Sequence, residues 1–281
     1  MSNSPTVKRR RLSAELRALR VDAKLTAEQA AHQLEWAPSK VTRIERNEWK
    51  RPDVRDIRDL LDLYGVTDEA RREELLALAR DSRQRGWWVD YQDVLSPGSV
   101  AEFEATAAQI HMFEALLIPG LLQTADYAAA VFRGGQVLDQ AVIDRHVAAR
   151  LARQEILERE DPPHLWAVID EAALRKQVGG VEVMRHQLEH IVAMCSRPNI
   201  AIQVVPDAAG AHAAMAGPFV IYEYASTEDA TLVYLETGTG DVFLEKPQEV
   251  IRYNVKFDHV CALALSEEAS VSHLRQLAND L

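Results

Sequence analysis

The chain has 281 residues, which is more than one compact core usually holds and enough for two domains. No stretch approaches the roughly 18 consecutive apolar residues of a membrane span, and no basic segment leads into an apolar signal region, so we expect neither a membrane protein nor an exported one. The two cysteines, Cys195 and Cys261, are far apart and lack histidines at metal-ligand spacing, which favours reduced thiols in a cytoplasmic protein over a disulfide.

Residues 26–47 have the spacing of a helix-turn-helix, in which two short helices meet near a right angle. Thr26 can cap the first helix with Gln29 closing a capping box, and Pro38 suits the first turn of the second. Ala31 supplies a small residue where the helices touch. A shared apolar stripe lies beneath both helices and consists of Ala30, Leu34, Val41 and Ile44. An ordinary helical hairpin with a basic face is the alternative.

The flanking segments favour the helix-turn-helix. Leucines at helical spacing predict a preceding helix over residues 12–23, and residues 54–65 predict a following helix that Gly65 ends. Four helices in this order, with an Ile-Glu-Arg triplet closing the third, resemble the Cro/repressor class of DNA-binding domain. The resemblance covers residues 12–66.

This resemblance has consequences for individual residues. It implies that Arg20 of the first helix pairs with Glu45 at the end of the third, as scaffold rather than as a DNA contact. Glu35 stands where the family usually has the turn glycine, so we expect a non-glycine residue at positive φ there. Ala27 stands where some relatives have a DNA-contacting glutamine, so that contact is missing.

The second helix of the motif presents side chains suited to DNA. We expect Ser39, Lys40 and Arg43 to reach base edges, with Thr42 also turned to solvent. Phosphate contacts are expected from Gln29, Arg46, Lys50 and Arg51. Because one recognition helix buries little surface, we expect a homodimer on near-palindromic double-stranded DNA, with half-sites about 34 Å apart.

The charge distribution agrees with this division of the chain. Residues 1–66 hold 14 Lys and Arg against 10 Asp and Glu, a net charge of +4, whereas the remaining residues hold 18 against 33, a net charge of −15. The total of −11 is therefore the sum of a basic region that could bind DNA and an acidic region that DNA would repel. The KRRR run at residues 8–11 predicts a basic arm over residues 1–11 along the phosphate backbone, with a solvated tail as the alternative.

Residues 67–96 are expected to form a helical and aromatic connector between the two halves. Thr67 or Asp68 can cap a bridging helix that reaches residue 83. Adjacent tryptophans follow at positions 87 and 88. They favour packing at the interface between the two domains over a surface that stacks against a ligand.

Residues 97–281 predict a mixed α/β domain with one sheet and packed helices, so the whole chain is a two-domain α+β protein. Residues 99–114 have a helical apolar face, and a further helix begins at Thr124 and stops at Gly134 and Gly135. A single helix is expected over residues 139–160, with its arginines on a solvated or partner-facing surface. From residue 162 onward, β-rich segments alternate with helices; they are residues 164–170, 199–205, 217–224, 230–236 and 241–245.

This second region resembles the C-terminal domain of the WhiJ-like, Scr1-type antitoxin-like transcriptional regulators of actinobacteria. The matching stretches run through most of residues 97–279 and include IPGLLQTADYA, IDEAALRKQVGG, MRHQLEHI, IQVVPDAAGAH, GPFVIYEY and YLET. The resemblance implies a DNA-binding regulator that works with a small acidic partner protein. It implies no enzymatic activity.

Several polar residues could nevertheless carry chemistry. Carboxylates and a histidine collect at expected strand ends and loops, namely Asp170, Glu171, His212, Glu236 and Asp241, where they could bind a metal or transfer protons. Helix capping and turn formation explain such residues equally well, and we expect no enzyme. His186 and His190 are four residues apart on a predicted helix, but no third ligand accompanies them, so we expect no metal and no cofactor.

Three hypotheses remain for the second domain. It binds a partner protein that adjusts DNA affinity, which is the reading we favour. It senses a small molecule in a pocket, which would be closed and apolar with a few polar groups. Or it is an enzyme, which requires Asp170, His212 and Glu236 to converge within hydrogen-bonding distance.

Overall fold

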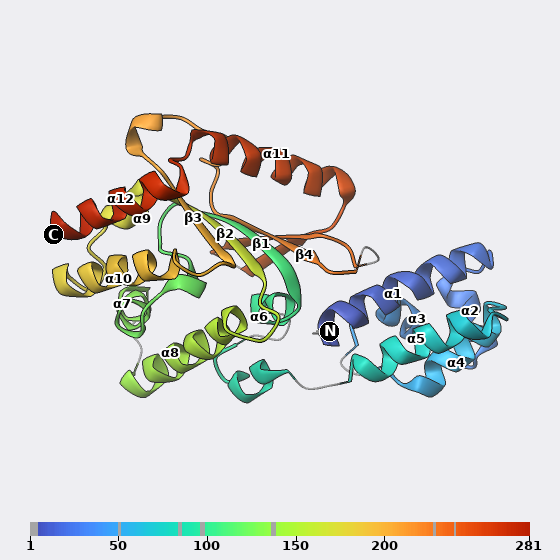
Figure 1. Cartoon of the computed structure of the whole chain (residues 1–281). Coiled ribbons are helices and arrows are strands. Elements are labelled where there is room, and N and C mark those ends of the chain that lie inside the picture. Colours follow the sequence, from blue (N-terminus) through green and yellow to red (C-terminus); the bar gives the residue numbers. More distant parts are fainter. Residues whose placement is uncertain are drawn as a thin grey trace. The chain divides into compact units, whose positions relative to one another are not determined.

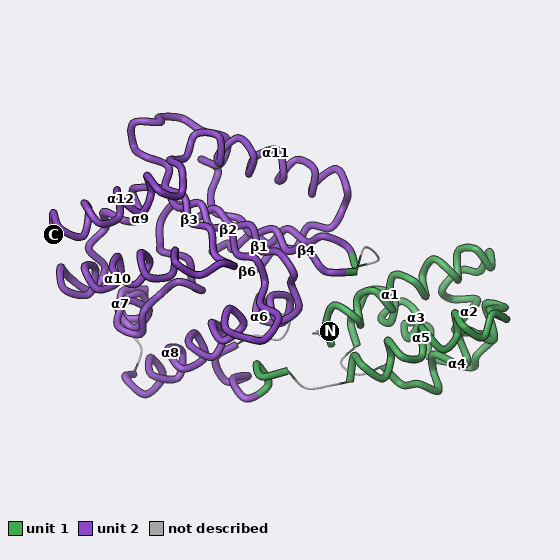
Figure 2. The backbone as a smooth tube through the Cα atoms, in the orientation of Figure 1, with its two compact units in different colours: residues 1–89, 226–229 green, residues 90–225, 230–281 purple. Residues whose placement is uncertain are grey.

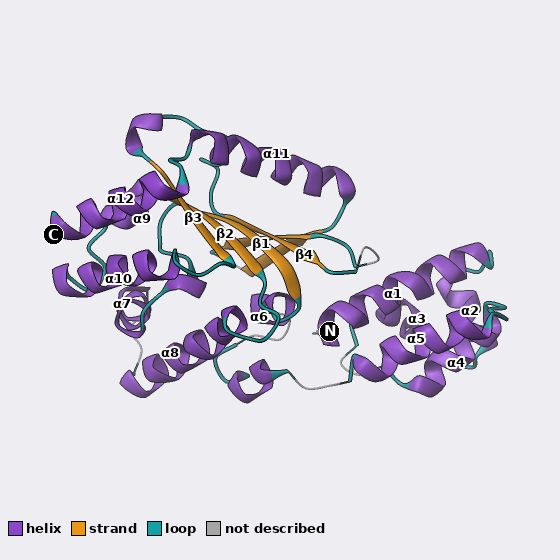
Figure 3. Cartoon of the chain, viewed as in Figure 1, coloured by secondary structure: helices purple, strands orange, loops and turns teal. Residues whose placement is uncertain are grey.

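The computed structural model describes residues 5–49, 52–83, 86–95, 99–135, 139–226, 229–238 and 240–281. The chain divides into two compact units, an N-terminal unit of residues 1–89 and a C-terminal unit that holds most of residues 90–281 (Figure 2). In the described part of the chain, none of the helices has the length and apolar character needed to cross a membrane. The helix-rich first unit and the sheet of the second confirm the predicted two-part fold (Figure 3).

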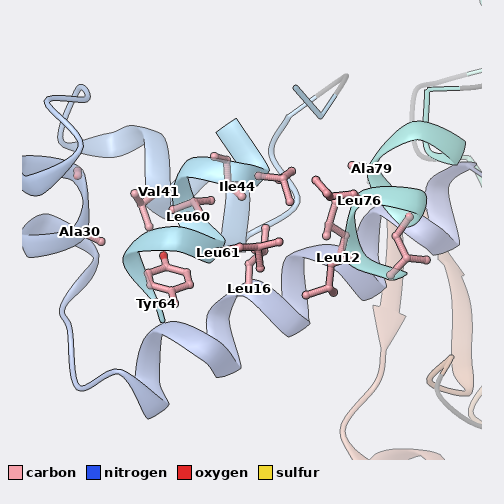
Figure 4. Packing of buried hydrophobic residues seen from close by; sticks show 14 residues of the cluster. Leu12, Leu16, Ala30, Val41, Ile44, Leu60, Leu61, Tyr64, Leu76 and Ala79 are labelled. Carbon is pink, nitrogen blue, oxygen red and sulfur yellow. The ribbon is translucent and has the colours of Figure 1, made fainter. Parts of the chain in front are cut away.

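In the described part of the N-terminal unit, the α-helices are α1 (Pro5–Asp22), α2 (Ala27–Gln33), α3 (Ser39–Glu45), α4 (Val54–Leu63) and α5 (Glu69–Asp81). Their apolar side chains meet in one core (Figure 4). Members fully shielded from solvent include Leu12, Leu16, Ala30, Val41, Ile57, Leu60, Leu61, Leu75 and Ala79. Ala30, Val41 and Ile44 of the predicted apolar stripe therefore belong to this core, and Leu34 packs against it.

The predicted basic arm is wrong for residues 5–11, because these residues are the first two turns of α1. Lys8 forms an ion pair with Asp81 and Arg11 with Glu74, both on α5. A spacing of three residues puts Lys8 and Arg11 on the same side of the helix, toward these acidic partners. Lysine and arginine also favour helix, so the segment extends α1 rather than trailing from it.

The helix expected to bridge the halves also belongs to the N-terminal unit. Asp68 caps α5 by accepting a hydrogen bond from the Ala70 amide at 3.0 Å, as one of the two predicted caps. The buried side chains of Leu75 and Ala79 then place α5 against α1 and α4. The first domain thus extends past residue 66, and the connector is shorter than predicted.

The C-terminal unit contains one six-stranded sheet. Its strands are β1 (Ala107–Glu114), β2 (His164–Asp170), β3 (Ile200–Val205), β4 (Phe219–Tyr224), β5 (Leu232–Thr237) and β6 (Gly240–Leu244). Their order is β3-β2-β1-β4-β5-β6, in which β1, β2 and β3 run parallel and the β1–β4, β4–β5 and β5–β6 pairs are antiparallel.

The helical face predicted over residues 99–114 is largely wrong. A short helix, α6 (Val100–Glu104), is followed by β1, which pairs with strands on both sides. Ile110, Met112 and Phe113 of β1 are all buried, because helices cover both faces of this central strand. A strand buried on both faces loses the strict alternation of polar and apolar residues, so its apolar positions imitated a helical period.

Helices lie on both faces of the sheet. They are α7 (Ala125–Gly135), α8 (Gln140–Gln154), α9 (Glu171–Arg175), α10 (Val181–Met194), α11 (Pro247–Leu263) and α12 (Glu267–Asn279). Figure 1 shows α11 over one face, where Phe257 and Val260 pack on Phe113 and Val168, and α6 and α8 beyond the other. The predicted stop of α7 at Gly135 is confirmed. The helix expected over residues 139–160 ends at Gln154 and continues as the 3₁₀ turn Glu155–Leu157.

Candidate functional sites

The turn of the helix-turn-helix is built as the sequence predicts. The Gln29 amide donates to Thr26 Oγ1 at 3.1 Å and the Thr26 amide donates to Gln29 Oε1 at 2.8 Å, which completes the capping box. Glu35 lies at φ 56°, so a non-glycine residue does occupy the left-handed turn position. The Trp36 amide then donates to the Ala31 carbonyl at 2.8 Å, which fixes the chain direction into α3.

The pair Arg20–Glu45 holds α3 against α1. Arg20 Nε lies 2.6 Å from Glu45 Oε1, and the second guanidinium nitrogen lies 2.8 Å from Oε2, so the contact is bidentate. A third donor reaches the Leu25 carbonyl at 2.6 Å. The side chains of Arg20 and Glu45 are only 13% and 7% exposed. The hydrogen bond to Glu45 raises the pKa of Arg20, with burial opposing it. The pair therefore joins α3 to α1 through two mostly buried side chains.

The outer face of α3 is available to a ligand. Ser39, Arg43 and Arg46 are exposed at spacings of four and three residues, which places them on one side of the helix, and Thr42 beside them is half-buried. Among the residues that the structure describes, none forms a hydrogen bond or ion pair with the side chain of Arg43 or Arg46. Arg43 on α3 and Arg46 at its C-terminal end therefore present two exposed guanidinium groups that no described residue pairs with.

Lys40 differs from this group. Its ammonium lies 2.7 Å from Asp56 Oδ1 of α4 and 3.8 Å from the centre of the Trp36 ring. The side chain is half-buried, so a base contact by Lys40 would have to break an existing ion pair. Gln29 is exposed, but its carbonyl oxygen already serves the capping box. The predicted phosphate contacts Lys50 and Arg51 lie outside the described residues.

The carboxylates and the histidine that we considered as possible metal-binding or proton-transferring groups do not all form one site. His212 Nε2 lies 3.3 Å from Asp170 Oδ2, while its Nδ1 accepts from the Ala214 amide at 3.3 Å. Both ring nitrogens are thus occupied, as in a histidine that ties a loop to a strand end. Glu236 follows Leu235, which packs under α11, so Glu236 points to the opposite face of the sheet from Asp170 and His212.

The remaining candidates have structural partners. Asp170 caps α9 through the Ala172 amide, and Glu171 accepts from the Asp207 amide at 2.8 Å. Asp241 accepts from the Tyr234 hydroxyl at 2.8 Å. His186 is exposed and His190 half-buried, and the described residues contain no cluster of three or more groups suited to a metal. Both cysteines have free thiols, whose pKa burial raises to about 11.

The arginines of α8 are not the solvated surface that the sequence predicts, apart from Arg145, which is paired with Asp93 at 2.8 Å. Arg153 makes a bidentate ion pair with Glu104 of α6, whose side chain is 1% exposed. The Tyr222 hydroxyl of β4 donates to the same carboxylate at 3.1 Å. Arg159 donates to the carbonyl groups of Ala105 and Ala107. These side chains are long enough to reach inward, which residue type alone did not indicate.

A second group of polar residues surrounds Arg150. Together with Arg153, Glu104 and Tyr222 it forms a polar layer on the α8 side of the sheet. Arg150 Nη1 donates to Gln123 Oε1 at 2.8 Å, and Gln123 Nε2 donates to the Ile118 carbonyl at 2.7 Å. A Cβ at Gly120 would lie 2.7 Å from that Nη1, so glycine leaves space for the guanidinium. Gln154 secures the turn by donating to the carbonyls of Gly120 and Gln123. The sequence signal was present in the Pro-Gly-Leu-Leu-Gln turn and in two arginines three residues apart.

Glu114, at the end of β1, completes the layer. It alternates with Phe113, which packs under α11, so its carboxyl group lies on the face of α8. Burial and then the negative charge of Glu236 raise the pKa of Glu114 to about 7, against the opposing effect of Arg153 and Arg150. Burial and then Arg153 lower the pKa of Arg150 to about 10.

The structure thus defines a helix-turn-helix protein with an appended α/β domain. Comparison with family models agrees: a Helix-turn-helix domain matches residues 11–75, and a Domain of unknown function (DUF5753) matches residues 98–276. The chain belongs to the latter family, since the match covers more than half of it. Neither the curated proteins nor the solved structures contain a significant match. The helix-turn-helix domain supports a DNA-binding regulator.

Proposed function

We propose that this protein is a transcriptional regulator that binds near-palindromic DNA as a homodimer, with α3 in the major groove. The observation that carries the proposal is the exposed face of Ser39, Arg43 and Arg46 on a helix that the Arg20–Glu45 pair holds in place. A forked guanidinium such as that of Arg43 suits the acceptor pair of guanine. Two such helices would lie about one DNA turn, or 34 Å, apart.

The C-terminal domain is proposed to adjust DNA affinity by binding a partner protein. The resemblance to WhiJ-like, Scr1-type regulators supports an antitoxin-like partnership of this kind. Exposed apolar side chains also support it, because Ile251 and Val255 lie one turn apart on the outer side of α11 and are 61% and 48% exposed. The negative charge of this domain would keep the surface that receives the partner away from DNA.

A small-molecule sensor is the second candidate, and the polar layer around Arg150 and Glu114 favours it. We propose that this domain carries out no reaction, because the groups that could have acted together are engaged or lie apart. The imidazole of His212 has both nitrogens engaged, and Glu236 lies on the opposite face of the sheet.

Selection of bound duplexes from random DNA tests the proposed function. We expect a near-palindromic motif for the full chain. Arg43→Ala should lose about 1–3 kcal/mol on that motif and relax the preference at one position of each half-site. Arg46→Ala should weaken binding on all sequences alike, because phosphate contacts carry no sequence information. Arg17→Ala is the matched control, since this exposed arginine of α1 lies outside α3.

Repeating the selection with the product of a small acidic neighbouring gene tests the partner. Enrichment that changes with the partner supports partner control, and enrichment that does not change favours the sensor. If the folded full chain selects no motif, the proposed DNA-binding role is wrong.

A further inference from the structure

The guanidinium of Arg150 is positioned before any ligand arrives. The turn at residues 118–124 supplies its acceptor, Gln123 Oε1, and the missing side chain of Gly120 supplies its space. The Phe132 ring lies 5.2 Å from the guanidinium carbon and borders it from α7. Gln154, one turn further along α8, holds the carbonyls of the turn. A fixed arginine loses little conformational freedom when it binds an anion.

Arg150 nevertheless lacks an anionic partner at bonding distance. Arg153, its neighbour on α8, is satisfied by the bidentate carboxylate of Glu104. Gln123 is neutral and uses one of the five N–H donors that a guanidinium carries. Within the described residues, none of the carboxylates is bonded to Arg150. The scaffold therefore orients a positive charge without neutralising it by contact.

The carboxyl groups of Glu114 and Glu236, on the same side of the sheet, carry negative charge to which no described cationic side chain is bonded. Glu114 is densely surrounded by protein, although some solvent reaches it, and it forms no hydrogen bond or ion pair with another described residue. Glu236 is exposed and extends the negative charge from Glu114 toward solvent. Two carboxyl groups on the same face of the sheet, of which Glu114 is largely enclosed by protein, favour a cation between them.

We propose that the α8 side of the sheet binds a small zwitterion of the amino-acid type, whose carboxylate pairs with Arg150 and whose ammonium faces Glu114 and Glu236. Each charge of the ligand would meet a protein charge to which none of the described residues is bonded. An anion without an ammonium would face the two carboxyl groups, and a cation without a carboxylate would leave Arg150 uncompensated. A ligand with both charges avoids both costs. That this binding controls DNA affinity rests on the proposed function, whereas the binding itself does not.

The site gives the binding a defined pH dependence. The charged and titratable groups around Glu114 are Glu236 of β5, Arg150 and Arg153 of α8, and Tyr127 of α7. An ammonium ligand needs Glu114 ionised, so affinity should rise between about pH 6 and pH 8 as this carboxyl group loses its proton. A simple carboxylate ligand would show the opposite trend, since it would favour protonated Glu114.

Thermal unfolding and calorimetric titration of the full chain test the site. The probes are the twenty proteinogenic amino acids, β-alanine and γ-aminobutyrate, the last two because their charges are further apart. We expect at least one probe to raise Tm and to bind more tightly at pH 8 than at pH 6. Its carboxamide and N-acetyl derivatives, which each lack one charge, should not bind. Arg150→Gln should weaken binding about tenfold or more, which is the loss expected for a charge-assisted contact.

Matched variants separate loss of the site from loss of the fold. Arg145→Gln changes an exposed arginine of the same helix and should bind as the native chain does. Glu114→Gln should weaken binding and remove its pH dependence. If none of the probes binds, or if Arg150→Gln binds as tightly as Arg145→Gln, the inference is wrong. Arg43→Ala should bind the probe normally, so failure of the DNA-binding proposal and failure of this site give different results.

Discussion

Replacement of Arg20 by alanine tests whether the Arg20–Glu45 pair is scaffold. Glu45 is 7% exposed and would lose both of its bidentate bonds, and the Leu25 carbonyl would lose its donor. Removing one partner of a buried ion pair costs about 3–5 kcal/mol, because the remaining charge stays buried. Since Arg20 keeps some solvent contact at 13% exposure, we expect the lower end, about 3 kcal/mol.

Tryptophan fluorescence during urea unfolding measures this loss in the full chain. Four of the five tryptophans, at positions 36, 49, 87 and 88, belong to the N-terminal unit, so the signal reports mainly on that unit. With an m-value of about 1 kcal/mol/M for a unit of this size, the midpoint should fall by about 3 M urea. Arg17→Ala is the control, because none of the described residues bonds to the side chain of this exposed arginine of α1, so the midpoint should stay nearly unchanged.

The double variant Arg20→Ala/Glu45→Ala completes the test. It should be more stable than the sum of the two single losses predicts, because removing both partners leaves no buried charge. The scaffold role is refuted if Arg20→Ala unfolds at the midpoint of Arg17→Ala. It is refuted equally if the variant is stable but no longer distinguishes its operator, since Arg20 would then be a DNA contact.

Three further predictions concern the Lys40 pair and the polar layer. Asp56→Asn should release Lys40 from its ion pair and strengthen binding to random duplex DNA several-fold at low salt. Fluorescence anisotropy measures this affinity. Unchanged affinity and salt dependence would show that Lys40 does not face DNA. Glu114→Gln should stabilise the C-terminal unit by about 1–3 kcal/mol at pH 8 and less at pH 5, measured by chemical unfolding. This direction follows from the pKa of Glu114, which the folded state raises to about 7. Because folded Glu114 holds its proton more tightly, the native chain loses stability as pH rises from about 4.5 to 7. A variant whose stability has the same pH profile would contradict this reasoning. Gly120→Ala should change the free energy of unfolding by less than about 1 kcal/mol, because the new Cβ meets only the terminal guanidinium nitrogen of Arg150, which can be displaced from its position. That displacement should abolish the thermal response to the amino-acid probe, and a normal response would mean that this glycine does not position the guanidinium.

The sequence by itself determined the helix-turn-helix to the level of single residues. The capping box of Thr26 and Gln29, the positive φ of Glu35 and the Arg20–Glu45 pair all lie where the pattern places them. These features depend on contacts between residues close in sequence or on a family pattern with fixed spacing, so local chemistry suffices to predict them.

Only the tertiary structure decided where the basic and acidic side chains lie. The KRRR segment reads as an arm until α5 brings Asp81 and Glu74 beside it. The arginines of α8 read as a solvated face until α6 and the sheet enclose Arg153 and Arg150. Strand β1 reads as helix because it is buried on both faces and therefore lacks the alternation of polar and apolar residues that would identify it. In each case the partner is distant in sequence, and a long side chain can point to water or inward with the same local pattern. The tertiary structure therefore determined which basic side chains form ion pairs, as Lys8, Arg11 and Arg153 do. It also determined that Arg150 and Glu114 lie in one polar layer.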